Sequence, residues 1–540
     1  MNDRSQAPSL AQLRHHADRL KQVHLRDLLT DVSRHALLQV QAGPIHADFS
    51  RQKIDAPALT ALEAWAEACG FQPSRHGLAT GAMLNFTEGR AAVHPALRGR
   101  FGPPDVQASA RFERTRMAAL VERLRSGELR GFDGSPLRAL VCLGIGGSDL
   151  GPRLVADALA PDGGYPVRFV ANADPRELER ALHGLAPQST AFAITSKTFT
   201  TRETLANAAE ARAWLREAGC PPEACADHFI GITAVPEAAR AWGIRHEQLL
   251  QFDAGVGGRY SVWSTVGLGV ATACGMPVFG ELLEGAAGMD AHFFEQPLTH
   301  NLPAVLGLMS VWNRSLLGHA SQAVVPYAER LALLPAWLQQ LVMESNGKTA
   351  RASGIDAGRT GLLTAPVVWG ACGTTAQHSF FQQLHQGPQA VPVEFLLVRS
   401  NGGLTAHNDE RQRIVLANAL AQAAALALGR PPLAQTTGHQ DFPGDRPSTL
   451  ILLQDLSARS IGALLAAYEH ATFTAAAVLG INPFDQFGVE LGKQLALQIE
   501  ESLQPGRVQA HVGPASGAAG ASAGNPALDL ATQASLKRLA

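Results

Sequence analysis

The stretch VCLGIGGSDLGP (141–152) places a short apolar run directly before a glycine-rich turn, with Ser148 and Asp149 opening the segment that follows. A short, continuously apolar run is typical of a strand buried on both faces of a parallel sheet. A helix that begins after such a turn presents free backbone N–H groups and the positive end of its dipole to an anion. The turn can also be only a tight connection. It lacks the Gly-Lys-Ser/Thr ending of a P-loop and the spacing of a dinucleotide-binding turn.

Further short apolar runs follow this stretch. Apolar runs alternate with helix-length segments, first as VRFVAN, AFAITS and HFIGITA, then from about residue 322 as QAVVPYA, APVVWG, VPVEFLLV and STLILLQD. This alternation predicts two α/β domains, each with a parallel sheet covered by helices. Apolar residues at helical spacing over 9–40 and 56–70 predict helices at the N-terminus. The Gly/Ala/Ser-rich stretch 512–525 predicts a mobile linker before a short C-terminal helix.

A second predicted strand ends in a cluster of hydroxyl groups. The segment AITSKTFTTRET (193–204) packs Ser196, Lys197, Thr198, Thr200 and Thr201 into six positions. Hydroxyls beside an ammonium suit a phosphate dianion, whose charge is about −1.5 to −2. The alternative is an ordinary N-cap and solvated turn, which rarely needs four hydroxyls and a lysine. Because ligands of parallel sheets bind beyond the carboxyl ends of the strands, both loops are predicted to line one phosphate-binding crevice.

The composition excludes several classes of protein. The chain has 540 residues, of which 46% are hydrophobic and 17% charged, so it can bury large cores. Its 45 basic and 47 acidic residues nearly cancel, which argues against nucleic-acid and membrane-surface partners. No signal-peptide core or membrane span is evident, and the six cysteines are scattered, so we expect a cytoplasmic protein with reduced thiols.

The two loops resemble the phosphate-binding loops of the sugar-isomerase (SIS) fold, and further motifs resemble the glucose-6-phosphate isomerase (phosphoglucose isomerase) family. In family order these motifs are DFSRQ (48–52), NFTEGRAAVHPALRG (85–99), GIGGSDLGP (144–152), SKTFTTRET (196–204), VGGRYSVWSTVGL (256–268), MESNGK (343–348), QHSFFQQLHQG (377–387) and INPFDQFGVELGKQLA (481–496). The resemblance therefore covers nearly the whole chain.

The resemblance implies an α/β fold of two SIS domains with helical N- and C-terminal segments. On this chain it implies an N-terminal helical segment at 1–115, a first SIS domain with the phosphate loops at 116–295, a second with the catalytic Glu and His at 296–505, and a linker with a C-terminal helix at 506–540. It also implies a homodimer whose active site lies at the domain and subunit interface. Small-molecule sugar phosphates would be the partners, with no metal and no organic cofactor.

The implied activity is the reversible isomerisation of glucose 6-phosphate to fructose 6-phosphate, in glycolysis and gluconeogenesis. It would proceed by ring opening and proton transfer between C2 and C1 through a cis-enediol or enediolate. The resemblance assigns the proton-shuttling base to Glu344, ring opening to His378 and Lys493, and polarisation of the substrate oxygens to Arg259. The implied substrate-binding residues are Gly147, Ser148, Ser196, Lys197, Thr198, Thr201, Gln340 and Gln486, with Glu203 as a supporting acid.

These residue types suit the chemistry. One carboxylate can remove a proton from a carbon and return it to the neighbouring carbon. A fixed guanidinium stabilises charge that develops on the substrate oxygens, and a histidine transfers protons in both directions near neutral pH. Without their motifs, Glu344 would usually be interpreted as a solvated acid at a helix end, Arg259 as part of a surface turn and Lys493 as a solvated lysine.

The sequence departs from the family at a few positions. In WGACGTTAQH (369–378), Ala371-Cys372 and Thr375-Ala376 replace an acid-proline pair and an Asn-Gly pair, and Arg411-Gln412 stand where a histidine pair is often found. None is an assigned catalytic position, so we expect changes in loop packing or subunit contact. Two alternatives remain open: an isomerase that also accepts mannose 6-phosphate, and a non-catalytic sugar-phosphate sensor. The joint presence of Glu344, His378, Lys493 and Arg259 argues against the sensor.

Overall fold

The computed structural model describes residues 10–352, 361–400, 408–430 and 438–503, together with residues 529, 531, 532 and 535. The chain divides into a first unit that runs to Phe484 and a second unit that begins at Asp485. The two units are described separately below. The predicted linker at 512–525 lies outside the described residues, and the bounds of the four predicted segments stay predictions.

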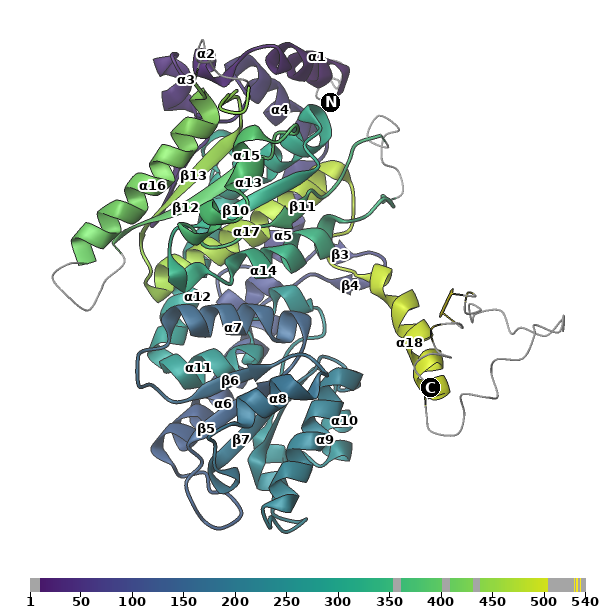
Figure 1. Ribbon diagram of the computed structural model, residues 1–540. Coiled ribbons are helices and arrows are strands. Elements are labelled where there is room, and N and C mark those ends of the chain that lie inside the picture. The colour runs from purple at the N-terminus through teal and green to yellow at the C-terminus, as the bar shows by residue number, and fades with distance from the viewer. Residues whose placement is uncertain are drawn as a thin grey trace. The chain divides into compact units, whose positions relative to one another are not determined.

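The first sheet of the first unit is entirely parallel and has the order β6-β5-β7-β8-β9. Its strands are β5 (Ala139–Leu143), β6 (Val167–Val170), β7 (Thr190–Thr195), β8 (Phe229–Thr233) and β9 (Leu249–Gln251). Flanking helices are α6 (Pro104–Ser126), α7 (Leu150–Leu159), α8 (Pro175–Leu182), α9 (Arg202–Glu217), α10 (Pro236–Trp242) and α11 (Leu268–Cys274) (Figure 1). Strands β5, β7 and β8 are buried at every residue, as the continuous apolar runs predicted.

The second sheet has the order β1-β2-β13-β12-β10-β11. Its parallel part consists of β10 (Ser321–Pro326), β11 (Val367–Trp369), β12 (Val393–Ser400) and β13 (Ser448–Asp455). Around it lie α12 (Met276–Glu295), α13 (Leu302–Val311), α14 (Leu334–Leu338), α15 (Phe381–Gln386), α16 (Asn408–Leu428) and α17 (Ala458–Leu479) (Figure 1). The expectation of two parallel sheets flanked by helices is therefore confirmed.

An N-terminal hairpin extends the second sheet. Strands β1 (Gln39–Ala42) and β2 (Ile45–Asp48) are antiparallel, and β2 pairs antiparallel with β13. The helices α1 (Leu10–Lys21), α2 (Leu25–Leu28), α3 (Val32–Leu37), α4 (Ala56–Ala68) and α5 (Phe71–Thr80) surround it in sequence. The helical spacing over 9–40 and 56–70 predicted α1 to α4 but neither α5 nor the hairpin. Two four-residue strands are too short for their alternation to be distinctive.

Helix α17 lies at the centre of the first unit. It begins after Ser457, whose hydroxyl accepts a hydrogen bond from the Ser460 N–H at 3.3 Å, and it ends at Gly480 with φ +70°. By length and composition it could cross a membrane, but its most apolar window is entirely buried inside the protein. Helices α12 and α13 pack against it at backbone distance. A Cβ on Gly285 of α12 would overlap the Arg459 carbonyl of α17, and a Cβ on Gly307 of α13 would overlap the Ala471 carbonyl.

A fully buried ionic network crosses the same contact. Arg98 donates from Nη1 and Nη2 to Glu469 Oε2, at 2.9 Å each, and its Nε lies 3.0 Å from Asp290 Oδ2. Asp290 Oδ1 lies 2.7 Å from His470 Nε2, and Trp263 Nε1 donates to Glu469 Oε1 at 2.8 Å. All four ionisable side chains are fully buried. Removing one member would leave an uncompensated buried charge, so this network ties α12, α17 and the segment at Arg98 together.

The second unit contains a short 3-10 turn at Phe487–Val489 and helix α18 (Glu490–Leu503). Its side chains Val489, Leu491, Leu497 and Leu503 are exposed.

The close packing of α12 on α17 predicts opposite effects for two glycines three residues apart on one helix. Gly285→Ala should lower the free energy of unfolding by about 1–3 kcal/mol, because the new Cβ meets a backbone carbonyl that cannot move aside. Gly288→Ala meets open space and should raise it by up to about 1 kcal/mol through helix propensity. Thermal unfolding at one scan rate measures both, and equal midpoints for the two variants would contradict the packing.

Candidate functional site

The two predicted phosphate loops leave neighbouring strands of the first sheet. The glycine-rich loop follows β5 and the hydroxyl-rich loop follows β7, and these strands pair in parallel, for example Leu143 with Ile194. The chain passes from β5 outward to β6 and then back across to β7, so the strand order reverses between β5 and β7. This reversal is the place where open parallel sheets bind their ligands. Both loops therefore leave the same edge of the sheet, and the single phosphate-binding crevice that they are predicted to line stays a prediction.

The hydroxyl-rich loop is held by its own side chains. Ser196 Oγ and Thr201 Oγ1 are 2.9 Å apart, and the hydroxyls of Thr198 and Thr200 are 2.7 Å apart. Lys197 Nζ donates to the Val256 carbonyl oxygen at 3.0 Å. Burial, with a smaller contribution from Arg90, lowers the pKa of this lysine. Thr201 is the N-cap residue of α9, so the loop ends at a helix N-terminus that favours anions.

The glycine-rich loop packs against the turn that carries Arg259. A Cβ on Gly147 would overlap the Gly258 carbonyl carbon and the Arg259 nitrogen, so only glycine fits there. Gly146 has φ +62°, and a Cβ on it would lie 3.0 Å from Gln340 Nε2. The fold therefore brings Gly147, Arg259 and Gln340 together, although they lie far apart in the sequence.

Arg259 is buried, with 1% of its side chain exposed, whereas the Glu344 side chain is 25% exposed. The guanidinium donates from Nε to Ser345 Oγ at 2.7 Å, from Nη2 to the Pro483 carbonyl oxygen at 2.5 Å, and from Nη1 to Glu344 Oε2 at 3.3 Å. The pair therefore consists of a fixed, desolvated cation and a carboxylate that solvent or a ligand can reach. That arrangement suits proton transfer at a carbon whose oxygen substituents gain charge.

The polar residues of MESNGK have separate partners. Glu344 ends a π-helical segment, Gln339–Glu344, a distortion often found at functional sites. Ser345 and Asn346 are buried, and Asn346 Nδ2 donates to the Thr472 carbonyl of α17 at 3.1 Å. Lys348 donates to the Asn482 carbonyl. These contacts hold the backbone that follows Glu344.

Gln340, in the same π-helical segment, has a buried Oε1 with no hydrogen-bond partner among the described residues. An unsatisfied buried acceptor costs about 1–3 kcal/mol, so a hydroxyl of a bound ligand would find a use here.

Within the described part of the chain, neither His378 nor Glu203 is joined to this group by a hydrogen bond or ion pair. His378 is exposed at the end of a 3-10 helix, Thr375–His378, which Gln377 ties to the Tyr327 hydroxyl at 2.7 Å. Glu203 is exposed in the first turn of α9. Lys493 and Gln486 belong to the second unit, where Lys493 Nζ lies 2.8 Å from Glu490 Oε1 on α18. Their roles stay predictions.

Two of the residues that depart from the family pattern, Gln412 and Cys372, have local contacts. Gln412 of α16 donates to the Val398 carbonyl of β12 at 2.6 Å, so it ties this helix to the second sheet. Cys372 is partly buried, and burial together with a bond to Glu329 raises the pKa of its thiol to about 12. Its sulfur therefore stays protonated near neutral pH.

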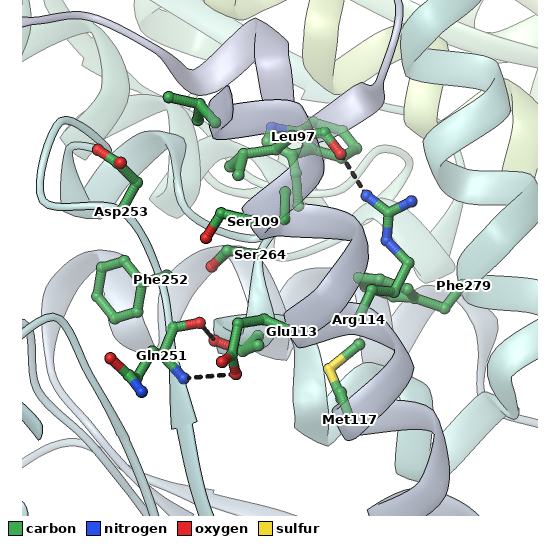
Figure 2. Close-up of a pocket in the computed structure, with 14 residues that line it drawn as sticks. Leu97, Ser109, Glu113, Arg114, Met117, Gln251, Phe252, Asp253, Ser264 and Phe279 are labelled. Atoms are coloured by element: carbon green, nitrogen blue, oxygen red, sulfur yellow. Dashed lines mark hydrogen bonds between the residues drawn. The ribbon is translucent and has the colours of Figure 1, made fainter. Parts of the chain in front are cut away.

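The cavity drawn in Figure 2 lies elsewhere, between α6 and the segments around Gln251 and Ser264. Its volume is about 20 Å³, which holds roughly one water molecule. Glu113 Oε2 accepts from the Gln251 N–H at 3.0 Å and Arg114 donates to the Leu97 carbonyl, so these polar groups are already paired (Figure 2). It is too small for a sugar phosphate. Over the described ranges, no three or more His, Cys, Asp or Glu side chains gather as a metal ion would require.

Comparisons with known proteins identify the family of the chain. A family model described as phosphoglucose isomerase matches residues 48–518. A glucose-6-phosphate isomerase of Paraburkholderia xenovorans (strain LB400) is 42% identical over 519 residues, which cover 92% of this chain and 94% of that protein. Another, of Burkholderia pseudomallei (strain 668), is 42% identical over 516 residues with the same coverage. The crystal structure of a glucose-6-phosphate isomerase from Chlamydia trachomatis D/UW-3/Cx has a TM-score of 0.82 at 31% identity and covers 93% of this chain and 96% of that one. The chain belongs to the phosphoglucose isomerase family.

Proposed function

We propose that this protein interconverts glucose 6-phosphate and fructose 6-phosphate without a metal or organic cofactor. The observation that carries the proposal is the Arg259–Glu344 pair, a buried guanidinium 3.3 Å from a partly open carboxylate, which the turn at Gly258 places against the glycine-rich loop. Membership of the family and the names of its relatives support it. In the cell the reaction would serve glycolysis and gluconeogenesis, in the cytoplasm.

Substrate binding begins with the phosphate. The two loops offer backbone N–H groups at the start of α7 and α9, several hydroxyls and one ammonium, which suit a dianion. The residues proposed to contact it are Gly147, Ser148, Ser196, Lys197, Thr198 and Thr201. Gln340, with its unsatisfied buried oxygen, is proposed to contact a sugar hydroxyl, and Gln486 is assigned to the sugar on the family resemblance alone.

Proton transfer follows ring opening. Glu344 takes the proton from C2 of the open-chain aldose, and the electron pair of that C–H bond forms the C1–C2 double bond of an enediolate. The same carboxylic acid then returns the proton to C1, while the proton of the C2 hydroxyl passes to the C1 oxygen and the C2 oxygen becomes the carbonyl of the ketose. Arg259 stands beside Glu344 and stabilises negative charge on the C1 and C2 oxygens without moving, because four protein groups already hold it.

Ring opening needs an acid for the ring oxygen and a base for the C1 hydroxyl. We assign these roles to His378 and Lys493, with Glu203 as a supporting acid. His378 is exposed on its own chain, which supports the proposal that the protein is a homodimer and that His378 completes the site of the partner.

The activity is tested by adding purified, metal-stripped protein to fructose 6-phosphate and measuring glucose 6-phosphate, with mannose 6-phosphate assayed in parallel. Turnover that survives exhaustive chelation is expected. Binding without turnover would favour the sensor, formation of mannose 6-phosphate would favour the relaxed isomerase, and activity restored only by a specific metal would contradict the cofactor-free mechanism.

Glu344→Gln should lower turnover by at least about 10²–10⁴-fold, the usual contribution of a general base, while fructose 6-phosphate still binds. The amide keeps the size of the side chain but cannot accept the C2 proton. Exchange of the C2 hydrogen with solvent should stop in parallel. Glu203→Gln is the comparison variant: if it stops this exchange and Glu344→Gln does not, the base is Glu203.

Ser196→Ala should weaken substrate binding by about 10- to 100-fold with little change in turnover at saturation, because a charge-assisted bond to phosphate is made equally in the ground and transition states. Competition by inorganic phosphate should weaken to the same extent. Ser126→Ala, at the exposed end of α6, is the control and should change neither. A large fall in kcat at unchanged affinity would take Ser196 out of the phosphate site.

Subunit mixing tests whether His378 acts across the dimer. Glu344→Gln and His378→Gln should each be inactive alone, but co-expression creates hybrid dimers in which one of the two sites has both residues intact. Random pairing then restores about one quarter of the parent activity, since half of the dimers are hybrids. If His378 serves its own chain, no hybrid site is complete and the mixture stays inactive.

A further inference from the structure

Behind Arg259 lies a closed ring of hydrogen bonds that the reaction scheme does not use. Arg259 Nε lies 2.7 Å from Ser345 Oγ, Ser345 Oγ lies 3.0 Å from the Tyr260 hydroxyl, and that hydroxyl lies 3.4 Å from the Pro483 carbonyl oxygen. Arg259 Nη2 donates to the same carbonyl at 2.5 Å and closes the ring. Arg259, Tyr260 and Ser345 are all buried.

One assignment of the protons satisfies every member. The guanidinium can only donate, so Ser345 Oγ accepts from Nε and is left to donate its own proton to the Tyr260 oxygen. Tyr260 then donates to the Pro483 carbonyl, whose two lone pairs also accept from Nη2. Burial raises the pKa of Tyr260, so the phenol keeps the proton that this arrangement needs.

The ring of Tyr260 is itself clamped. His94 stacks on it with centroids 4.6 Å apart and planes 24° apart, and Phe484 lies 5.9 Å from it on the segment that carries the Pro483 carbonyl. Burial, with Arg98 as the next cause, lowers the pKa of His94 well below its usual range, so the stacked imidazole adds no charge beside two buried arginines. A neutral stack of this kind fixes the phenol plane and therefore the direction of its hydroxyl.

We propose that Tyr260 and Ser345 are positioning residues, which hold the Arg259 guanidinium at the angle and distance from Glu344 that the reaction requires. The inference rests on the proposed isomerase function. Ser345 follows Glu344 directly, so the same hydroxyl that orients the guanidinium also anchors the backbone of the proton-shuttling residue. Tyr260 follows Arg259 directly, so its buried side chain anchors the backbone next to Arg259.

If Tyr260 and Ser345 position Arg259, their loss should affect turnover and substrate affinity differently. The guanidinium has one edge committed to Ser345 and Pro483 and presents Nη1 to Glu344. Without the Tyr260 hydroxyl, Ser345 loses its acceptor and can rotate, and the guanidinium loses its fixed plane. Phosphate contacts would remain, because they come from the loops after β5 and β7. Turnover should fall while substrate affinity is kept.

The test uses Tyr260→Phe, which removes one oxygen and keeps the stack on His94, and Ser345→Ala as a second variant. Tyr165→Phe is the matched control, because the Tyr165 hydroxyl has no hydrogen-bond partner among the described residues. Both test variants should lower kcat by about 10- to 100-fold, the range for a misplacement of about 1 Å, with KM within about 3-fold of the parent. The control should match the parent in both constants.

A double-mutant cycle separates positioning from general stability. In an Arg259→Lys background the fork of N–H groups is gone, so Tyr260→Phe should lower kcat by less than about 3-fold further. An equal loss in both backgrounds would mean that Tyr260 supports the fold only, and unchanged kcat in the single variants, or a rise in KM alone, would overturn the inference.

A crystal structure of Tyr260→Phe supplies a readout that needs no activity. The expected result is a guanidinium rotated or shifted relative to Glu344. A guanidinium in the parent position would overturn the inference even if the parent protein were inactive, and an inactive parent by itself would count only against the proposed isomerase function.

Discussion

The burial of one positive charge, that of Arg259, is the constraint on which the site depends. A guanidinium with 1% of its side chain exposed is tolerated only where its N–H groups find partners and its charge is balanced. The partners found here come from Glu344, 85 residues along the chain, and from Pro483, 224 residues along it. Satisfying this one group therefore fixes three distant segments against each other. The glycine-rich loop then packs on the same turn, because Gly147 has no side chain to hold it away.

A second buried arginine, Arg98, belongs to a network that anchors the turn carrying Arg259. Arg98 pairs with Glu469 and Asp290, and Trp263, four residues after Arg259, donates to the same Glu469. Burial raises the pKa of Glu469 to about 7 against the opposing effect of Arg98. The turn that carries Arg259 is thus anchored at both ends, by Pro483 on one side and by the core helix α17 on the other. Such rigidity suits an electrostatic role, in which a dipole or charge must not reorganise as the reaction proceeds.

The groups proposed for proton transfer and those proposed for ring opening differ in their surroundings. Arg259 is enclosed and Glu344 is only partly open, whereas His378 is exposed and Lys493 lies on α18 in the second unit. Proton transfer between adjacent carbons benefits from a fixed geometry and little water. Ring opening requires contact with a bulky closed sugar, which an exposed side chain can reach. This division gives a physical reason for a site that one subunit would begin and another would complete.

The sequence by itself determined the features that depend on local order. Continuous apolar runs predicted the buried strands β5, β7 and β8, which the structure confirms. The glycines after β5 and the hydroxyls after β7 predicted an anion site, and the motif around Glu344 predicted a base; these two functions stay predictions. The tertiary structure decided the rest. It showed the β1–β2 hairpin, whose four-residue strands are too short to give a distinctive sequence pattern. It also showed that position 147 must be glycine because the backbone of Gly258 packs against it, and not because of the conformation of its own turn.

Tyr260 and Ser345 belong to the motifs VGGRYSVWSTVGL and MESNGK, but the sequence assigned no role to either, because a tyrosine or serine has no distinctive chemistry until its partners are known. Those partners are 85 or more residues away, and periodicity and capping reach only across one turn of helix or one strand. The residues that form a helix or strand are therefore determined locally. The hydroxyl that holds a given guanidinium is decided only when the folded chain removes both groups from water and brings them within hydrogen-bond distance.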